Sequence, residues 1–208
     1  MIIILTGGIG CGKSMISQLL KVMGYAVYDC DSRAKVLMNT DSQLRLSLEA
    51  LLGKETYQTA DGSLNRSFVA SRIFQNRKLL TQINALVHPA VAEEIRTEAA
   101  QTSLLFVESA IYYESGFSHL IPADQVWCIA APLDLRIARA MQRDQATQEK
   151  VMARINSQIS QEEKIKKADA ALWNDSTHSL IEQVNQLLIS LFPTFTAIDA
   201  AVSNRQDR

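Results

Sequence analysis

The sequence predicts an α/β fold built on a parallel sheet, and three observations support this. The run Ile2-Ile3-Ile4-Leu5 is apolar and largely β-branched without a break, as expected of a strand covered on both faces. A helical pattern and then a second strand pattern at 25–28 follow it, which together make a βαβ unit. Strand patterns return at 104–107 and 126–130. A chain of 208 residues is long enough for one such core with insertions.

The N-terminal elements can be assigned in order. The first helix begins at Lys13, because apolar residues then recur at helical spacing, and Gly24 stands at the position of a C-cap. The pattern over 32–51 is helical. Residues 53–100 show no buried-strand pattern, and 64–95 is interpreted as two helices. This middle segment therefore reads as a helical insertion into the α/β core.

The C-terminal half completes the core. A basic helical segment, 134–167, follows the strand at 126–130. A short strand is expected at 170–173, and a final helix has apolar residues of 180–191 on one face. The residues beyond Pro193 are interpreted as a peripheral tail.

Composition excludes several classes of protein. A net charge of −1 with 47% hydrophobic residues is typical of a globular protein and gives no general attraction to nucleic acid or membranes. The apolar N-terminal stretch of about five residues is too short for a signal sequence or a membrane span. The cysteines, Cys11, Cys30 and Cys128, lack metal-ligand spacing and suit a reducing compartment. We expect a cytoplasmic protein with no nucleic-acid or membrane partner.

The most specific motif lies between the first strand and the first helix. Gly7-Gly8-Ile9-Gly10-Cys11-Gly12-Lys13-Ser14 has the G-x-x-x-x-G-K-[ST] spacing of a phosphate-binding loop. Glycines let the backbone point N–H groups at phosphates, and the helix N-terminus adds partial positive charge. Lys13 is expected to reach the β- and γ-phosphates, and the Ser14 hydroxyl to ligate Mg²⁺. An ordinary glycine-rich turn is the alternative, but the flanking strand and helix are the context that the motif requires.

Two carboxylates, Asp29 and Asp31, stand at the carboxyl end of the second strand, where open α/β sheets place ligands. Two residues apart, both can face the same side, so one can accept a proton from an attacking hydroxyl while the other orients it or binds Mg²⁺ through water. Alternatively, one of them caps the following helix. The neighbouring phosphate-binding loop favours the chemical interpretation.

Three arginines, Arg136, Arg139 and Arg143, share one face of a predicted helix. Guanidinium groups on a closing lid stabilise the charge of a phosphoryl-transfer transition state. A solvated charged face is the alternative. Their position after the fourth strand favours a lid. Two further residues, His88 before a helix-interrupting Pro89 and Arg66 at a helix start, are equally consistent with ligand contacts and with structural or surface roles.

Taken together, these motifs resemble the dephospho-CoA kinase family over nearly the whole chain. The matching pieces are Leu5-Thr6-Gly7-Gly8-Ile9-Gly10-Cys11-Gly12-Lys13-Ser14, Asp29-Cys30-Asp31, Leu64-Asn65-Arg66 followed by Phe74, His88-Pro89, Glu114, Arg139 with Arg143-Asp144, Arg154 to Gln158, and Ala168-Asp169 with Asn174. This order and spacing is far more specific than the loop alone.

The resemblance implies a P-loop NTPase core of five parallel strands, similar to nucleoside-monophosphate kinases, formed by 1–33, 97–133 and 168–208. It implies a helical substrate domain at 34–96 and a lid at 134–167. The implied activity is transfer of the γ-phosphoryl of MgATP to the 3′-hydroxyl of dephospho-CoA, the last step of coenzyme A synthesis. A monomer or weak homo-oligomer is expected.

The resemblance also assigns roles to residues. Asp31 would accept the hydroxyl proton, Lys13 would hold the phosphates, and Arg139 with Arg143 would neutralise developing charge. The implied ATP-binding residues are Gly8, Ile9, Gly10, Cys11, Gly12, Lys13, Ser14, Met15, Arg139 and Asn174, with Ser14 as the Mg²⁺ ligand. The implied substrate-binding residues are Thr6, Asp29, Asp31, Arg66, His88 and Glu114.

This chain departs from the family pattern in a few places. Glu108 and the following Ser109-Ala110-Ile111 replace a common Asp-x-Pro-Leu, Met15 replaces a frequent Thr or Ser, and Arg136 stands where Gln is common. These departures bear on the substrate contacts of 108–114 and leave the groups needed for the mechanism in place.

Other functions are less consistent with the sequence. A shikimate or nucleoside-monophosphate kinase can also carry a carboxylate after its second strand. A GTPase-like switch is disfavoured because the sequence has no Asn-Lys-x-Asp guanine-reading motif. A binding module without catalysis is disfavoured because Lys13, Ser14, Asp31 and Arg139 are all present.

Overall fold

The computed structural model of the chain describes residues 1–58, 60–73 and 76–192. Its five strands form one sheet in the order β2-β3-β1-β4-β5. The pairings whose register is described, β2 with β3, β1 with β3 and β4 with β5, are parallel. The strands are β1 (Ile2–Thr6), β2 (Ala26–Asp29), β3 (Leu105–Glu108), β4 (Gln125–Ala130) and β5 (Ala170–Trp173). The predicted five-stranded parallel α/β fold is confirmed.

The strands form where unbroken apolar runs can be buried on both faces. Ile3, Ile4 and Leu5 of β1 have no exposed surface, and neither do Phe106 and Val107 of β3. Each of these side chains leaves water whichever way it points, which is the condition that favours β-branched and large apolar residues in a covered parallel sheet. The core of the fold therefore contains the runs that were read as buried strands.

The described residues fall into two compact units. The first comprises Met1–Thr6 and Leu20–Val126, and the second comprises Gly7–Leu19 and the described part of Trp127–Arg208. The division into a core, a substrate domain at 34–96 and a lid at 134–167 stays a prediction.

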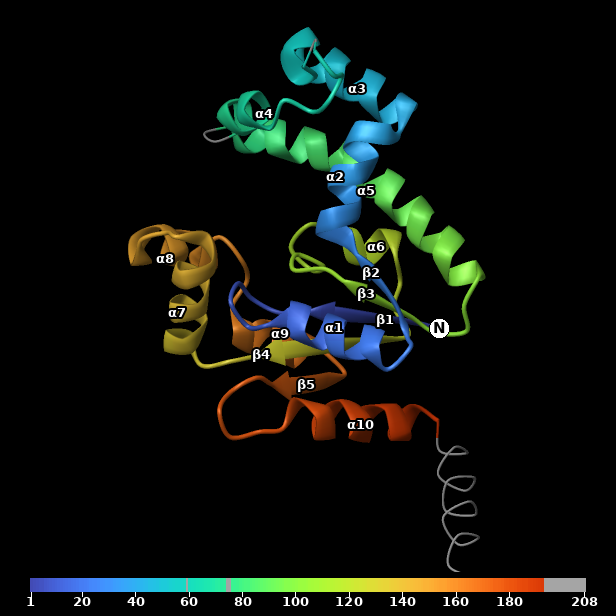
Figure 1. The fold of residues 1–208 in the computed structure, drawn as a ribbon, viewed down its shortest axis with the longest axis vertical. Helices are drawn as coiled ribbons and strands as arrows, with labels where there is room; N and C mark the ends of the chain where they lie inside the picture. The colour runs from blue at the N-terminus through green and yellow to red at the C-terminus, as the bar shows by residue number, and fades with distance from the viewer. Residues whose placement is uncertain (59, 74–75, 193–208) are drawn as a thin grey trace, which may run out of the picture. The chain divides into compact units, whose positions relative to one another are not determined.

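The first unit carries a helical region after β2. Figure 1 shows α5 running from α4, past α2, toward the start of β3, and α5 packs against α2, α3, α4 and α6. These elements are α2 (Cys30–Thr40), α3 (Ser42–Leu52), the 3₁₀ helix η1 (Lys54–Thr56), α4 (Arg66–Ile73), α5 (Arg77–Ala100) and α6 (Phe117–Leu120). The two helices expected in 64–95 are thus present. Phe74, one of the motif residues, lies outside the described residues.

The helical pattern over 32–51 forms two helices, divided at Asp41. Asp41 has extended backbone angles, and its Oδ1 accepts a hydrogen bond from the backbone N–H of Leu44 at 2.7 Å. The same residue therefore ends α2 and caps α3. An aspartate before a helical run is a recognised helix-start signal, so the sequence did contain the information needed to place this break.

Pro89 does not interrupt a helix, contrary to prediction. It lies inside α5, which is continuous from Arg77 to Ala100. A buried stripe on that helix, formed by Ile83, Val87, Val91 and Ile95, holds it against the rest of the unit. Pro89 has no N–H to donate to the backbone carbonyl one turn earlier in the helix. Because Pro89 is exposed, water can bind that carbonyl instead. Tertiary packing outweighs the local cost of proline here.

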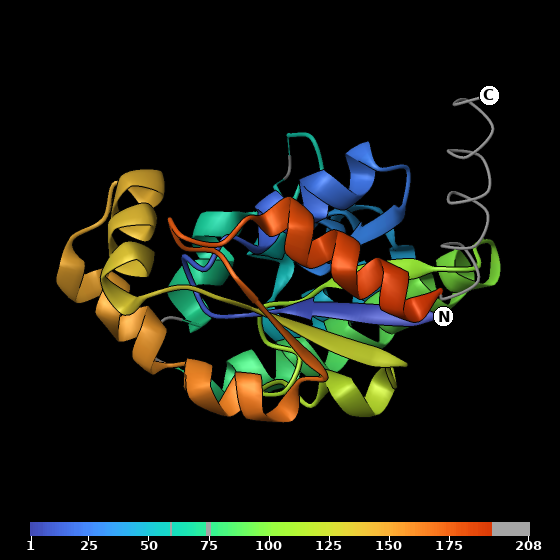
Figure 2. The same ribbon diagram turned by 90° about the horizontal axis from the view of Figure 1, so that it is seen from below.

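The second unit contains the glycine-rich loop and the C-terminal elements. Its helices are α1 (Lys13–Val22), which begins in this unit, α7 (Leu133–Asp144), α8 (Gln148–Asn156), α9 (Gln161–Lys167) and α10 (Leu180–Leu191). Helices α7 and α8 pack together as a hairpin, and α10 lies along β5 (Figure 2). None of the helices in the described ranges has the length and apolar character needed to cross a membrane.

Candidate active site

The phosphate-binding loop adopts the backbone that its glycines were expected to permit. Gly10 has φ 77° and Gly12 has φ 91°, values that side-chain-bearing residues rarely adopt. The Cys11 N–H donates to the Gly8 carbonyl at 3.3 Å, and the Met15 N–H donates to the Gly12 carbonyl at 3.0 Å, where α1 begins. The loop thus turns tightly into a helix N-terminus, the arrangement that binds phosphate oxygens.

Lys13 lies over this loop. Its Nζ donates hydrogen bonds to the carbonyl oxygens of Gly7 at 2.9 Å and Gly8 at 3.3 Å. Ser14 follows in the first turn of α1 with an exposed side chain. The ammonium group and the hydroxyl predicted to bind phosphate and Mg²⁺ therefore belong to the same short segment.

Arg139 and Asn174 meet at the loop. The Asn174 Nδ2 donates to the Cys11 carbonyl at 2.9 Å. Arg139 donates from Nη1 to the Asn174 carbonyl at 3.1 Å and from Nη2 to the Asn174 Oδ1 at 3.3 Å. Asn174 also contacts Met15, with 3.7 Å between its Nδ2 and the sulfur. The structure therefore brings the loop together with two residues from distant parts of the sequence that were predicted to bind ATP.

The three arginines of α7 differ in their surroundings. Arg136 is buried, Arg139 binds Asn174, and the Arg143 side chain is 61% exposed. Arg143 forms a two-point ion pair with Asp144, from Nε at 2.8 Å and Nη2 at 3.0 Å, and Arg154 binds the same carboxylate at 2.6 Å. The two guanidinium groups hold the pKa of Asp144 well below its usual range. The predicted catalytic role of Arg143 stays a prediction.

Contacts to Ile9 were not foreseen. The Ile9 N–H donates to the Gln158 Oε1 at 3.1 Å, and the Ile9 carbonyl accepts from the Arg136 Nε at 3.0 Å. Gln161 accepts from the Ala131 N–H at 3.0 Å. Side-chain amides carry little specific sequence signal. The family resemblance had marked Arg154 to Gln158 as a matching piece, without assigning it a contact to Ile9.

Asp29 and Asp31 have different positions at the end of β2. Asp29 is the N-cap of α2: its Oδ1 accepts from the backbone N–H groups of Asp31 at 3.0 Å and Ser32 at 3.1 Å. The capping alternative therefore describes Asp29, and its predicted substrate contact stays a prediction. Asp31 lies in the first turn of α2 with an exposed side chain.

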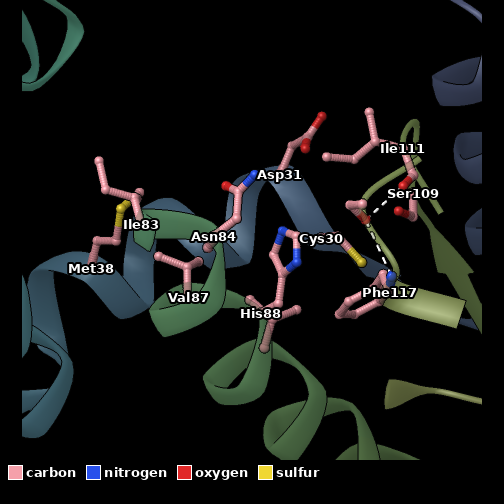
Figure 3. Close-up of a pocket in the computed structure, with 13 residues that line it drawn as sticks. Cys30, Asp31, Met38, Ile83, Asn84, Val87, His88, Ser109, Ile111 and Phe117 are labelled. Atoms are coloured by element: carbon pink, nitrogen blue, oxygen red, sulfur yellow. Dashed lines mark hydrogen bonds between the residues drawn. The ribbon is translucent and has the colours of Figure 1, made fainter. Parts of the chain in front are cut away.

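A cavity of about 180 Å³ adjoins Asp31. Figure 3 shows Asn84 and His88 in its middle, Met38 and Ile83 toward one end, and Ser109 with Ile111 toward the other. The His88 ring packs edge-on against Phe117, and burial lowers the pKa of His88. This mixture of a carboxylate, neutral polar groups and an apolar floor suits a ligand with both a polar and an apolar part.

The other predicted substrate residues lie elsewhere in the first unit. Glu114 lines a neighbouring cavity that also touches His88, and its carboxylate oxygens are buried. Arg66 is exposed at the start of α4 in a separate, polar cavity. The Thr6 hydroxyl at the end of β1 is buried and has no hydrogen-bond partner among the described residues. Sequence reasoning missed Asn84 and Ser109, which line the cavity beside Asp31.

The loop fits the Mg²⁺ ion that such sites employ. The part of the chain that the structure describes contains no group of three or more His, Cys, Asp or Glu side chains that could hold a metal by themselves. Mg²⁺ typically takes one or two protein oxygens and completes its shell with phosphate oxygens and water. The exposed Ser14 hydroxyl beside Lys13 is suited to such a sparse site.

Comparison with known proteins identifies the family. The family model described as dephospho-CoA kinase matches residues 1–179. A dephospho-CoA kinase from Bacteroides fragilis is 39% identical over 96% of this chain and 97% of its own length. Among solved structures, a Thermus thermophilus protein has a TM-score of 0.80 at 29% identity, covering 92% of this chain and 97% of its own. A dephospho-CoA kinase from Campylobacter jejuni has a TM-score of 0.64 at 25% identity, covering 90% and 96%.

The matched region contains the loop, Asp31, Arg139 and Asn174, so the resemblance first inferred from motifs extends to the sequence and the fold. On these grounds, the chain belongs to the dephospho-CoA kinase family.

Proposed function

We propose that the chain transfers the γ-phosphoryl group of ATP to the ribose 3′-hydroxyl of dephospho-CoA, producing coenzyme A and ADP. The observation that carries this proposal is the position of Asp31 at the start of α2, beside a cavity with polar and apolar walls. A carboxylate in that place can accept a hydroxyl proton while the rest of the acceptor lies against the cavity. The family's substrates support the choice of acceptor.

In the proposed reaction, the 3′-oxygen forms a bond with the γ-phosphorus as the bond between that phosphorus and the β,γ-bridging oxygen breaks. The hydroxyl proton passes to the Asp31 carboxylate, and the electron pair of the broken bond leaves on ADP. Little covalent chemistry is left for the protein, so catalysis rests on alignment and on charge stabilisation.

The loop residues would supply that stabilisation. Lys13 would exchange its bonds to the Gly7 and Gly8 carbonyls for phosphate oxygens, and the N–H groups at the start of α1 would point at the β-phosphate. Arg139, held by Asn174, would stabilise charge that develops on the transferred group, with Arg143 assisting. Ser14 would hold Mg²⁺, which neutralises phosphate charge when bound.

The proposal extends to the setting of the enzyme. The cysteines Cys11, Cys30 and Cys128 are all buried and free, which suits a reducing cytoplasm. We further propose that the active species is a monomer or a weak homo-oligomer acting on ATP and dephospho-CoA, without nucleic-acid or membrane partners. Size-exclusion chromatography with light scattering tests the oligomeric state directly.

An acceptor panel tests the activity. The purified chain is incubated with MgATP and, separately, dephospho-CoA, shikimate or AMP, and the products are identified by mass spectrometry and phosphorus NMR. We expect phosphate on the 3′-oxygen of dephospho-CoA and little ATP consumption with the other acceptors. Transfer to shikimate or AMP in preference to dephospho-CoA would refute the assignment.

Asp31→Asn tests the mechanism separately. An asparagine amide is close in shape to the carboxylate but cannot take the proton, so turnover should fall by roughly two to four orders of magnitude. Binding of MgATP, measured by calorimetry, should be unchanged because the loop is intact. Turnover close to that of the wild type would remove Asp31 from the role of base.

A further inference from the structure

Arg136 is a buried cation that the proposed mechanism does not use. Only 5% of the residue is exposed. Among the described residues, no carboxylate lies within ion-pair distance of its guanidinium. Glu162 is exposed at the start of α9, and the Arg136 charge is the smallest of the influences that lower the pKa of Glu162. A buried charge without a partner is unfavourable, so its presence calls for an anion or for a compensating role.

The contacts of Arg136 are to the phosphate-binding loop and to Gln161. Its Nε donates to the Ile9 carbonyl at 3.0 Å, and its Nη1 lies 3.5 Å from the Gln161 Oε1. A methyl group added to Gly8 would overlap the guanidinium, and one added to Gly10 would overlap the Arg136 backbone carbonyl. Arg136 therefore fills the space that side chains on the loop would need, and it fixes the Ile9 peptide from one side.

The loop around this guanidinium is already positive. The Lys13 ammonium donates to the Gly7 and Gly8 carbonyls and, at 3.9 Å, to the Cys11 sulfur, and the helix N-terminus adds its partial charge. If Arg136 served only to fill space and to donate to the Ile9 carbonyl and Gln161, a neutral amide could donate there without the desolvation penalty of a charge. A second cation beside the loop, here a buried one, is favourable when the loop holds a polyanion.

We propose that Arg136 is a positioning residue for the polyphosphate of the nucleotide. Through Gly8 and Ile9 it sets the shape of the loop, and its fixed charge favours the β- and γ-phosphates over nucleotides that lack them. The proposal rests on the ATP-binding half of the proposed function and not on the identity of the acceptor.

Three substitutions separate charge from shape. Arg136→Gln keeps an N–H donor for the Ile9 carbonyl and removes the charge. Arg136→Lys keeps the charge and loses the planar fork. Arg136→Met keeps much of the volume and removes both. Arg96→Gln, which removes an exposed arginine paired with Glu93 in the first unit, serves as the control for net charge.

Calorimetric titration of the full chain with MgATP, MgADP and AMP, without acceptor, measures the effect. We expect Arg136→Gln to weaken MgATP binding by about tenfold or more, the factor for one lost charge interaction, and AMP binding by much less. Arg136→Lys should recover most of the MgATP affinity, and Arg96→Gln should match the wild type. In steady state, the KM for ATP should rise more than kcat falls, with an unchanged KM for dephospho-CoA.

Several outcomes would overturn this role. Arg136→Gln binding MgATP as tightly as the wild type would show that the charge is not used. Equal weakening of MgATP and AMP, or a lysine variant as weak as the methionine one, would show that only loop shape is affected. If thermal melts show that none of the three variants folds, the residue is structural. A wild-type chain that binds MgATP but does not phosphorylate dephospho-CoA would refute the proposed acceptor. It would leave the proposed role of Arg136 in nucleotide binding unaffected.

Discussion

The Asp29 carboxylate accepts a hydrogen bond from the backbone N–H of Asp31, with 3.0 Å between Oδ1 and the nitrogen. The two acids of this short motif therefore differ in role: Asp29 holds the backbone of the helix start, and Asp31 exposes its carboxylate there. Asp29 also accepts two hydrogen bonds from Ser32: its Oδ1 accepts from the Ser32 backbone N–H, and its Oδ2 accepts from the Ser32 hydroxyl at 2.6 Å. The first turn of α2, which carries Asp31, is therefore held at its start by a neighbouring carboxylate.

Removing the cap should destabilise the protein and disturb Asp31 only indirectly. Asp29→Ala loses the acceptors for two backbone N–H groups, so the free energy of unfolding should fall by about 1 kcal/mol. Turnover should fall too, but much less than in Asp31→Asn, because the base remains. Urea denaturation and steady-state kinetics on both variants check this.

Asp29→Asn is the matched control, since asparagine caps helices about as well as aspartate. It should retain most of the stability. If its turnover nevertheless falls as far as that of Asp31→Asn, Asp29 contributes its charge directly to the reaction, as the sequence had suggested, and capping is not its main role.

His88 should make stability depend on pH. Burial lowers the pKa of His88, so the folded protein keeps the imidazole neutral where the unfolded chain protonates it. Its contribution to stability is fully present above the ordinary histidine pKa of about 6.5 and is lost as pH falls below that value toward the folded-state pKa. Denaturation of the wild type and of His88→Gln, at about pH 7.5 and about pH 5, measures this. If His88→Gln loses as much unfolding free energy on acidification as the wild type does, other titrating groups cause the loss.

Gln145 is strained at the end of α7. It has φ 48° and ψ 42°, and it is the one residue other than glycine with positive φ among those described. Glycine adopts this left-handed conformation without the steric cost, so Gln145→Gly should raise the free energy of unfolding by about 0.5–1 kcal/mol. The gain is reduced by loss of the bond from Gln145 Nε2 to the Gln142 carbonyl. Gln145→Ala relieves no strain and loses the same bond, so thermal melts should show it to be less stable than the wild type.

The Gln158 side chain should compete with nucleotide for the loop. Its Oε1 accepts from the Ile9 N–H, one of the groups predicted to bind ATP. A nucleotide that uses this N–H must displace the amide, so Gln158→Ala should tighten MgATP binding by about two- to tenfold, the worth of one ordinary hydrogen bond. Weaker binding in the variant, seen by calorimetry, would mean that Gln158 itself contacts the nucleotide.

The sequence predicted the central strands β1, β3 and β4 well because burial on both faces leaves a continuous apolar run, which few other structures produce. The end points of helices were harder to predict. Asp41 and Pro89 are both residue types that often mark the end of a helix, but tertiary packing decides whether the helix ends there. At Asp41 the local capping bond prevailed and divided the helix. At Pro89 the buried stripe on α5 prevailed and the helix continued.

The site was predictable to the extent that its residues carry recognisable motifs. Lys13, Ser14 and Asp31 stand in short patterns whose spacing follows from their chemistry. By contrast, helical periodicity placed Arg136 and Arg143 on one face but could not show that one is buried against the loop and the other paired with Asp144. The environment of Arg136 depends on a contact between segments more than a hundred residues apart, as does the contact of Cys11 with Asn174. Arg143 instead pairs with its neighbour in the sequence, a choice of partner that helical periodicity does not encode.

The space that Arg136 occupies beside Gly8 and Gly10 links positions that are distant in the sequence. The G-x-x-x-x-G-K-[ST] pattern leaves both positions free, yet here a methyl group at position 8 would overlap the Arg136 guanidinium, and one at position 10 would overlap the Arg136 backbone. Alanine at position 8 is therefore accommodated without displacement after position 136 has lost its guanidinium, while in the reverse order of substitutions the guanidinium must first move aside. Mutational histories and directed-evolution libraries should accordingly show the two positions changing in that sequence, with the arginine replaced first.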